Sequence, residues 1–151
     1  MIPFVGVGRG YLMKPLLNTE NPLVLRVDFT SQVIWEEICR IIQAPVDDFY
    51  AYVEFLNEPK YEGIMKDDLL ALIPKTYNHN FIIMVDRTAI SEIDHPLLVI
   101  DLSEGSNWSF RAIPSTVQSI ENNLSIANIS FEEFASSVDE CGVFLGFFEG
   151  K

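Results

Sequence analysis

Basic residues are scarce in this sequence. Its 151 residues include 10 lysines and arginines against 22 aspartates and glutamates, which gives a formal net charge of −12. The imbalance is largest in residues 88–151, where two basic side chains stand against ten acidic ones. Nucleic acids and anionic membranes are bound mainly through lysine and arginine, so neither is expected as a partner. A basic protein partner or a bound cation fits the charge better, although acidity that serves only solubility would look the same.

Cysteines and long apolar runs are also few. Cys39 and Cys141 form no Cys-x-x-Cys pair and no metal-ligand spacing, which argues against a disulfide scaffold and a zinc site. No apolar run approaches the roughly 18–20 residues that a membrane helix needs. The N-terminus lacks the basic region and the cleavage pattern of a secretory signal. We therefore expect a cytoplasmic protein with reduced thiols.

Signatures of catalysis are missing as well. The sequence has no G-x-S-x-G segment, no glycine-rich loop with a Gly-Lys-Ser/Thr ending, and only two isolated histidines. No cofactor and no catalytic residue are predicted, and a non-enzymatic protein is favoured over an enzyme.

What is present is the pattern of one α/β domain. We expect a flexible tail over residues 1–21 and a single domain over residues 22–151. Apolar segments that end in aspartate predict strands at residues 23–28, 81–86 and 97–101. Further strands are expected at residues 50–56, 108–113 and 143–148, and helices at 30–43, 66–73, 114–123 and from 130 onward. The order favours a mixed central sheet of about five to six strands with flanking helices.

Three aspartates follow the apolar strands, namely Asp28, Asp86 and Asp101. Ligands of open parallel sheets bind beyond the carboxyl ends of the strands, so these carboxylates could hold Mg²⁺ for phosphoryl transfer or nucleotide binding. Aspartate after a strand is, however, also a common helix cap or turn residue. The structural interpretation is favoured.

Two arginines lie within strand segments. Arg26 and Arg111 are expected to be buried, where a guanidinium needs carboxylates or carbonyls for its donors. Pairing with one of the three aspartates is the favoured interpretation, and anion binding is the alternative.

A polar cluster surrounds the predicted helix at residues 114–123. Glu121, Asn122 and Asn128 belong to it. Asparagines near a helix end usually support the following turn, and a recognition surface is the alternative.

Several of these segments together resemble a bacterial family of unknown function. They are residues 22–29, the helix around Trp35, and residues 81–86, 96–102, 110–114 and 121–128, followed by Phe-Glu-Glu-Phe-Ala at 131–135. The resemblance covers residues 22–148. It implies a stand-alone bacterial protein, largely actinobacterial, and it carries no activity and no catalytic residue.

The leading hypothesis is therefore a non-enzymatic acidic module that binds a basic protein partner, for example an immunity-type protein that neutralises a basic toxin. The rival is a Mg²⁺-dependent or nucleotide-binding domain that uses Asp28, Asp86 and Asp101. A homo-oligomer is a third option, and it would need an exposed apolar patch. Its candidate residues are Phe144, Leu145, Phe147 and Phe148.

Overall fold

A six-stranded mixed sheet forms the centre of the protein. The computed structural model describes residues 19–106 and 108–147. Its sheet has the order β2-β1-β3-β4-β5-β6. The strands are β1 (Leu23–Arg26), β2 (Glu54–Leu56), β3 (Phe81–Val85), β4 (Leu97–Asp101), β5 (Ser109–Ala112) and β6 (Val143–Phe144). The prediction of a single α/β domain with a mixed sheet is thereby confirmed.

Strand direction decides which residues share an edge of the sheet. β1 pairs in parallel with both β2 and β3, whereas β4 is antiparallel to β3 and to β5, and β6 is parallel to β5. The carboxyl ends of β1, β2 and β3 therefore lie at one edge, which we call the carboxyl edge. β4 ends at the opposite edge, where Asp101 is paired with Phe81 at the start of β3.

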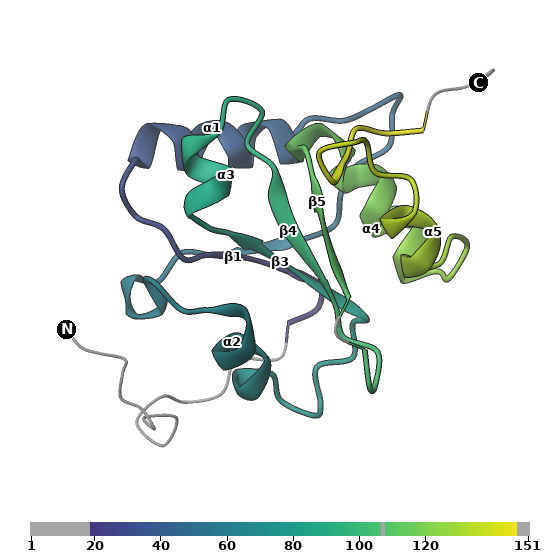
Figure 1. The fold of residues 1–151 in the computed structure, drawn as a ribbon, viewed down its shortest axis with the longest axis horizontal. Helices are drawn as coiled ribbons and strands as arrows, with labels where there is room; N and C mark the ends of the chain where they lie inside the picture. The colour runs from purple at the N-terminus through teal and green to yellow at the C-terminus, as the bar shows by residue number, and fades with distance from the viewer. Residues whose placement is uncertain (1–18, 107, 148–151) are drawn as a thin grey trace.

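Helices cover both faces of the sheet. They are α1 (Gln32–Gln43), α2 (Lys66–Leu72), α3 (Arg87–Ser91), α4 (Val117–Ser125) and α5 (Phe131–Ala135), with 3-10 turns η2 (Pro59–Tyr61) and η3 (Pro114–Thr116). Figure 1 shows α1 and α3 on one side of the strands and α2 on the other. The larger core lies under α1, α3, α4 and α5, and the smaller one under α2. No helix of the described part is long and apolar enough to cross a membrane.

The apolar stripe of α1 explains its position. Trp35, Ile38 and Ile42 recur at helical spacing and are buried against the sheet. The side chain of Ser31 accepts the Ile34 amide proton and caps the helix, one residue after the predicted start at Thr30. At the other end, the chain leaves the helix before Pro45, as the proline predicts.

Most other predicted elements are present, with shifted ends. The hairpin partner of β4, the short helix at α2 and the capping box at Ser130 and Glu133 are confirmed. Pro114 occupies the first position of a 3-10 turn, and α4 begins after that turn. The strand expected at residues 50–56 is reduced to β2, and the predicted tail over residues 1–21 lies almost wholly outside the described residues.

Candidate functional site

The three strand-end aspartates do not form one site. Asp28 and Asp86 follow β1 and β3, which are neighbours, so both lie at the carboxyl edge. Asp101 ends β4 at the opposite edge of the sheet. The rival hypothesis placed one magnesium ion between all three carboxylates, and their positions at opposite edges do not allow that arrangement. Within the described residues, no three His, Cys, Asp or Glu side chains are grouped so that they could hold a metal ion.

Each of these carboxylates instead supports local structure. Oδ1 of Asp28 accepts hydrogen bonds from the amide and the hydroxyl of Thr30, and Oδ1 of Asp101 accepts the same pair from Ser103. In each case the backbone amide two residues further along donates to the carboxylate, as in Asx turns. Oδ1 of Asp86 accepts the Ala89 amide proton at 3.2 Å and caps α3.

Arg111 forms the expected ion pair with one of the aspartates. Its two terminal nitrogens lie 2.8 Å from the two carboxylate oxygens of Asp86, and Nη1 also donates to the Pro96 carbonyl. This parallel geometry is the strong form of an arginine–carboxylate contact. The pair joins β5 to the start of α3, so Arg111 has a structural role here.

Arg26 lacks the carboxylate partner that we expected. It is 2% exposed, and no ion pair joins it to a described residue. Its guanidinium donates to the Asp28 carbonyl and to the side-chain oxygens of Gln32 and Asn57. The prediction was wrong because the Asp28 carboxylate turns to Thr30, which leaves only neutral oxygens near the guanidinium.

The guanidinium of Arg26 fills the place where this fold class binds ligands. The connection after β1 carries α1 on one face of the sheet, and the connection after its neighbour β2 carries α2 on the other face, so the two connections diverge between the carboxyl ends of β1 and β2. There the guanidinium carbon lies 4.3 Å from the ring centre of Phe29 and 5.2 Å from that of Trp35. Arg26, Phe29 and Trp35 thus lie against one another at the position where open α/β sheets usually bind ligands.

The predicted polar cluster on α4 contacts the segment that precedes β2 and is separate from the aspartates discussed above. Oε1 of Glu121 accepts the Tyr52 amide proton at 2.9 Å and the Asn122 side-chain amide at 2.7 Å, and Oε2 accepts the Ser125 hydroxyl at 2.8 Å. Asn122 also donates to the Tyr50 carbonyl. Glu121 and Asn122 therefore hold the segment between α1 and β2 against α4. These contacts, made off the sheet, also explain why the strand predicted from residue 50 begins only at Glu54.

That segment, residues 46–52, is named the aromatic loop. It begins with a tight two-residue turn in which Val46 and Phe49 exchange two backbone hydrogen bonds. The central residues Asp47 and Asp48 have φ values of 51° and 71°, the left-handed pair that such turns require. Left-handed backbone in residues other than glycine is strained and recurs at functional sites. Both aspartate side chains are exposed.

The aromatic loop exposes three aromatic side chains close together in the sequence. Phe49 and Tyr52 are 60% and 59% exposed, Tyr50 is also exposed, and Ile126 after α4 is 74% exposed. An open groove of about 540 Å³ is lined by residues of the loop, of α4 and of the turn that follows it, and we name it the loop–helix groove. Its lining consists of Phe49, Tyr52, Gln118, Glu121, Asn122, Asn123, Ser125 and Ile126. Clustered exposed aromatic side chains with a polar rim are typical of protein interaction sites.

Sequence analysis missed the aromatic loop as a site. Glu121 and Asn122 were identified, but Tyr50 and Tyr52 were assigned to a strand and Phe49 was not considered. Three aromatics at 49, 50 and 52 directly after an Asp-Asp turn were the available signal. Asn128 supports the end of α4, as the favoured interpretation predicted, because its side chain and its amide donate to Asn123.

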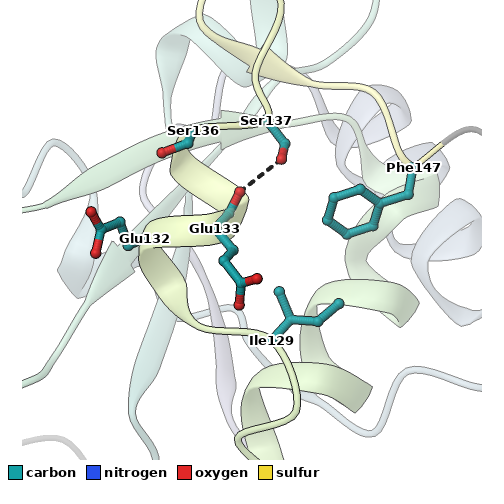
Figure 2. Close-up of a pocket in the computed structure, with 6 residues that line it drawn as sticks. All are labelled: Ile129, Glu132, Glu133, Ser136, Ser137 and Phe147. Atoms are coloured by element: carbon teal, nitrogen blue, oxygen red, sulfur yellow. Dashed lines mark hydrogen bonds between the residues drawn. The ribbon is translucent and has the colours of Figure 1, made fainter. Parts of the chain in front are cut away.

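A second hollow of about 540 Å³ lies beside α5 (Figure 2). Figure 2 shows the Phe147 ring on the side of the hollow facing Glu133 and Ile129, with the Ser137 hydroxyl donating to the Glu133 carbonyl. The Glu133 carboxylate accepts the Ser130 amide proton in the capping box. The Glu133 carboxylate and the Ser137 hydroxyl at this hollow are thus engaged in contacts within and next to α5.

The apolar patch proposed for a homo-oligomer is smaller than expected. Phe144 is fully buried in the larger core, so its assignment to an exposed patch was wrong. The physical reason is that β6 pairs with β5 and turns this ring toward Phe110 and Phe134. Leu145 and Phe147 are exposed in part, and Phe148 lies outside the described residues.

Both cysteines are free thiols in different surroundings. Burial raises the pKa of the half-buried Cys39 thiol to about 11, whereas Cys141 is exposed. Because the thiolate is the nucleophile, we expect iodoacetamide at pH 8 to alkylate Cys141 at least about tenfold faster than Cys39. Mass spectrometry of timed samples measures both rates. The Cys39 rate should rise about tenfold per pH unit up to pH 10, and a Cys39 rate that does not change with pH would contradict this.

Together these observations define a single-domain α/β protein with a mixed six-stranded sheet and an aromatic surface beside α4. Residues 21–147 match the model of a family described as Domain of unknown function (DUF6924), and the chain belongs to this family. The match covers almost the same residues as the resemblance noted from the sequence. A search of curated proteins finds no match.

Proposed function

We propose that this protein is a non-enzymatic module that binds a basic protein partner through the aromatic loop and the loop–helix groove. The observation that carries the proposal is the exposure of Phe49, Tyr50 and Tyr52 on a loop held by Glu121 and Asn122. Large aromatic side chains are the commonest energetic anchors of protein interfaces. Such residues are rarely left clustered in solvent without a role in binding.

The charge around the loop supports a basic partner. Asp47 and Asp48 lie at its tip, and no lysine or arginine occurs in residues 41–59 or in residues 112–150, the two stretches that contain the groove. An acidic surface attracts a basic protein during diffusion and disfavours acidic competitors. Neutralisation of a basic toxin by an immunity-type bacterial protein in the cytoplasm is one concrete form of this function.

A pull-down with matched variants tests the proposal. The tagged full-length protein is compared with a Phe49→Ala/Tyr52→Ala variant and with a Trp108→Ala control, which removes an exposed aromatic from β5's hairpin instead. We expect a basic protein to be enriched from the native host at low salt, and to fall at least about tenfold with the loop variant, because two interface anchors are removed. The Trp108→Ala control should capture the basic protein as the wild type does, and high salt should weaken capture by all variants.

Three results would count against the proposal. They are capture of the same proteins by the loop variant, loss of capture with the Trp108 control, or enrichment of acidic proteins only. Thermal unfolding of all three proteins shows whether the exposed substitutions leave the fold intact, as surface changes normally do.

A further inference from the structure

The Glu121 carboxylate is buried, and no described residue gives it a positively charged partner. Glu121 is 5% exposed, and no ion pair joins it to another described residue. Its three hydrogen-bond donors are a backbone amide, an asparagine amide and a serine hydroxyl, all of which are neutral. These contacts satisfy part of its hydrogen-bonding capacity and leave its negative charge uncompensated.

The position of this charge is the second observation. Glu121 lines the loop–helix groove, where Oε2 accepts a single hydrogen bond from Ser125. A carboxylate offers about four acceptor positions over its two oxygens, so further donors can be accommodated. A donor that carries a positive charge would form the stronger, charge-assisted kind of hydrogen bond.

The aromatic walls of the same groove favour a cation. Phe49 and Tyr52 both line it and expose most of their surface. The face of an aromatic ring attracts a cation, and guanidinium groups stack on rings more readily than ammonium groups because they are planar and weakly hydrated. The chain itself contains this arrangement, since the Arg26 guanidinium lies over the ring of Phe29.

We infer that the loop–helix groove accepts an arginine side chain of the partner, with Glu121 as its counter-charge and Phe49 and Tyr52 as its aromatic contacts. This inference rests on the proposed function and names the chemical group that the groove recognises. The guanidinium enters between the aromatic loop and α4, where the aromatic rings lie against its apolar faces. None of the described residues that line the groove is a lysine or arginine, so they supply no cation of their own.

Titration with a small probe tests this inference without the partner. N-acetyl-arginine amide is added to the ¹⁵N-labelled full-length protein, and its neutral isostere, N-acetyl-citrulline amide, is added in parallel. We expect saturable shifts of the Tyr52 backbone amide and the Asn122 side-chain amide, both of which donate to Glu121, with a millimolar dissociation constant. The citrulline probe should bind at least about fivefold more weakly because it lacks the charge.

Two variants and one control make the test specific. Glu121→Gln keeps the size and an oxygen acceptor for the Tyr52 amide, so we expect the fold to persist and arginine-probe binding to weaken at least about fivefold. Tyr52→Leu removes an aromatic contact without touching Glu121 and should weaken the probe about two- to tenfold. The control Glu132→Gln, at the second hollow, should bind the probe as the wild type does.

Equal binding of citrulline, unchanged binding by Glu121→Gln and Tyr52→Leu, or shifts that map away from the groove would overturn the inference. The outcome separates from that of the proposed function. Capture of the basic partner could still depend on Phe49 and Tyr52 while binding of the arginine probe is unchanged by Glu121→Gln. In that case only the arginine site is contradicted. If capture of the partner is independent of the aromatic loop, the proposed function itself fails.

Discussion

Replacing Phe134 with alanine is expected to lower the free energy of unfolding by about 3–5 kcal/mol, the largest effect of any single substitution considered for this protein. Phe134 is fully buried on α5. Its ring centre lies 6.1 Å from that of Phe110, 5.1 Å from that of Phe144 and 5.4 Å from that of Phe147. Truncation removes these contacts and leaves a cavity that the β5–β6 edge of the sheet cannot fill by small shifts.

Urea denaturation followed by tryptophan fluorescence measures this effect, since Trp35 is buried in the same core. The matched control is Phe147→Ala, which removes a ring of the same aromatic group that is half exposed. We expect the control to lose less than about 1.5 kcal/mol, because part of its surface is already in water. Equal losses for the two variants would show that Phe134 is not the centre of this cluster.

Replacing Asp86 with alanine is expected to lower the free energy of unfolding by about 2–4 kcal/mol. The substitution breaks two structural contacts at once. It removes the bidentate ion pair with Arg111, in which both side chains are 24% exposed, and it removes the cap of α3. Arg111 would keep only the Pro96 carbonyl as an acceptor. A partly buried guanidinium without a counter-charge is the main source of the loss.

A series of substitutions separates the two contributions. Asp86→Asn keeps an oxygen to cap α3 but removes the charge, so we expect roughly half the loss of the alanine variant. Arg111→Met removes the guanidinium, and a double-mutant cycle with Asp86→Ala then measures the coupling between the two side chains. A coupling energy of about 1–3 kcal/mol is expected, and a coupling near zero would mean that the cap alone accounts for the effect.

The strand pattern of this sequence was enough to predict the sheet but not the direction of β4. The apolar segments that became β1, β3 and β4 are similar, and each ends at or just before an aspartate. Direction depends on the connection between strands. Residues 86–96 separate β3 from β4 and contain only the five-residue α3, which is short for a parallel crossover of a dozen or more residues. The length of this connection therefore carried information that the apolar pattern did not.

Residues of the candidate site were predictable to different degrees. The polar character of Glu121 and Asn122 on a helix was evident from local sequence. Their contact with the aromatic loop was not, because Glu121 and Tyr52 are 69 positions apart and no local rule pairs them. Phe49, Tyr50 and Tyr52 also have high strand propensity, so local sequence favours a strand here. In the structure, hydrogen bonds to Glu121 and Asn122 on α4 hold their backbone away from the sheet. The predicted ion pair of Arg26 was wrong for a related reason. The Asp28 carboxylate accepts a hydrogen bond from nearby Thr30 instead of pairing with Arg26.

The left-handed turn at Asp47 and Asp48 determines the shape of the aromatic loop before any partner arrives. Ordering a side chain or a loop on association costs about 0.5–1.5 kcal/mol of conformational entropy for each flexible side chain. Here the Val46–Phe49 hydrogen bonds and the Tyr52–Glu121 contact have already ordered the backbone during folding. A partner would meet a nearly rigid surface, and changes in the loop sequence should alter how long the complex lasts more than how fast it forms.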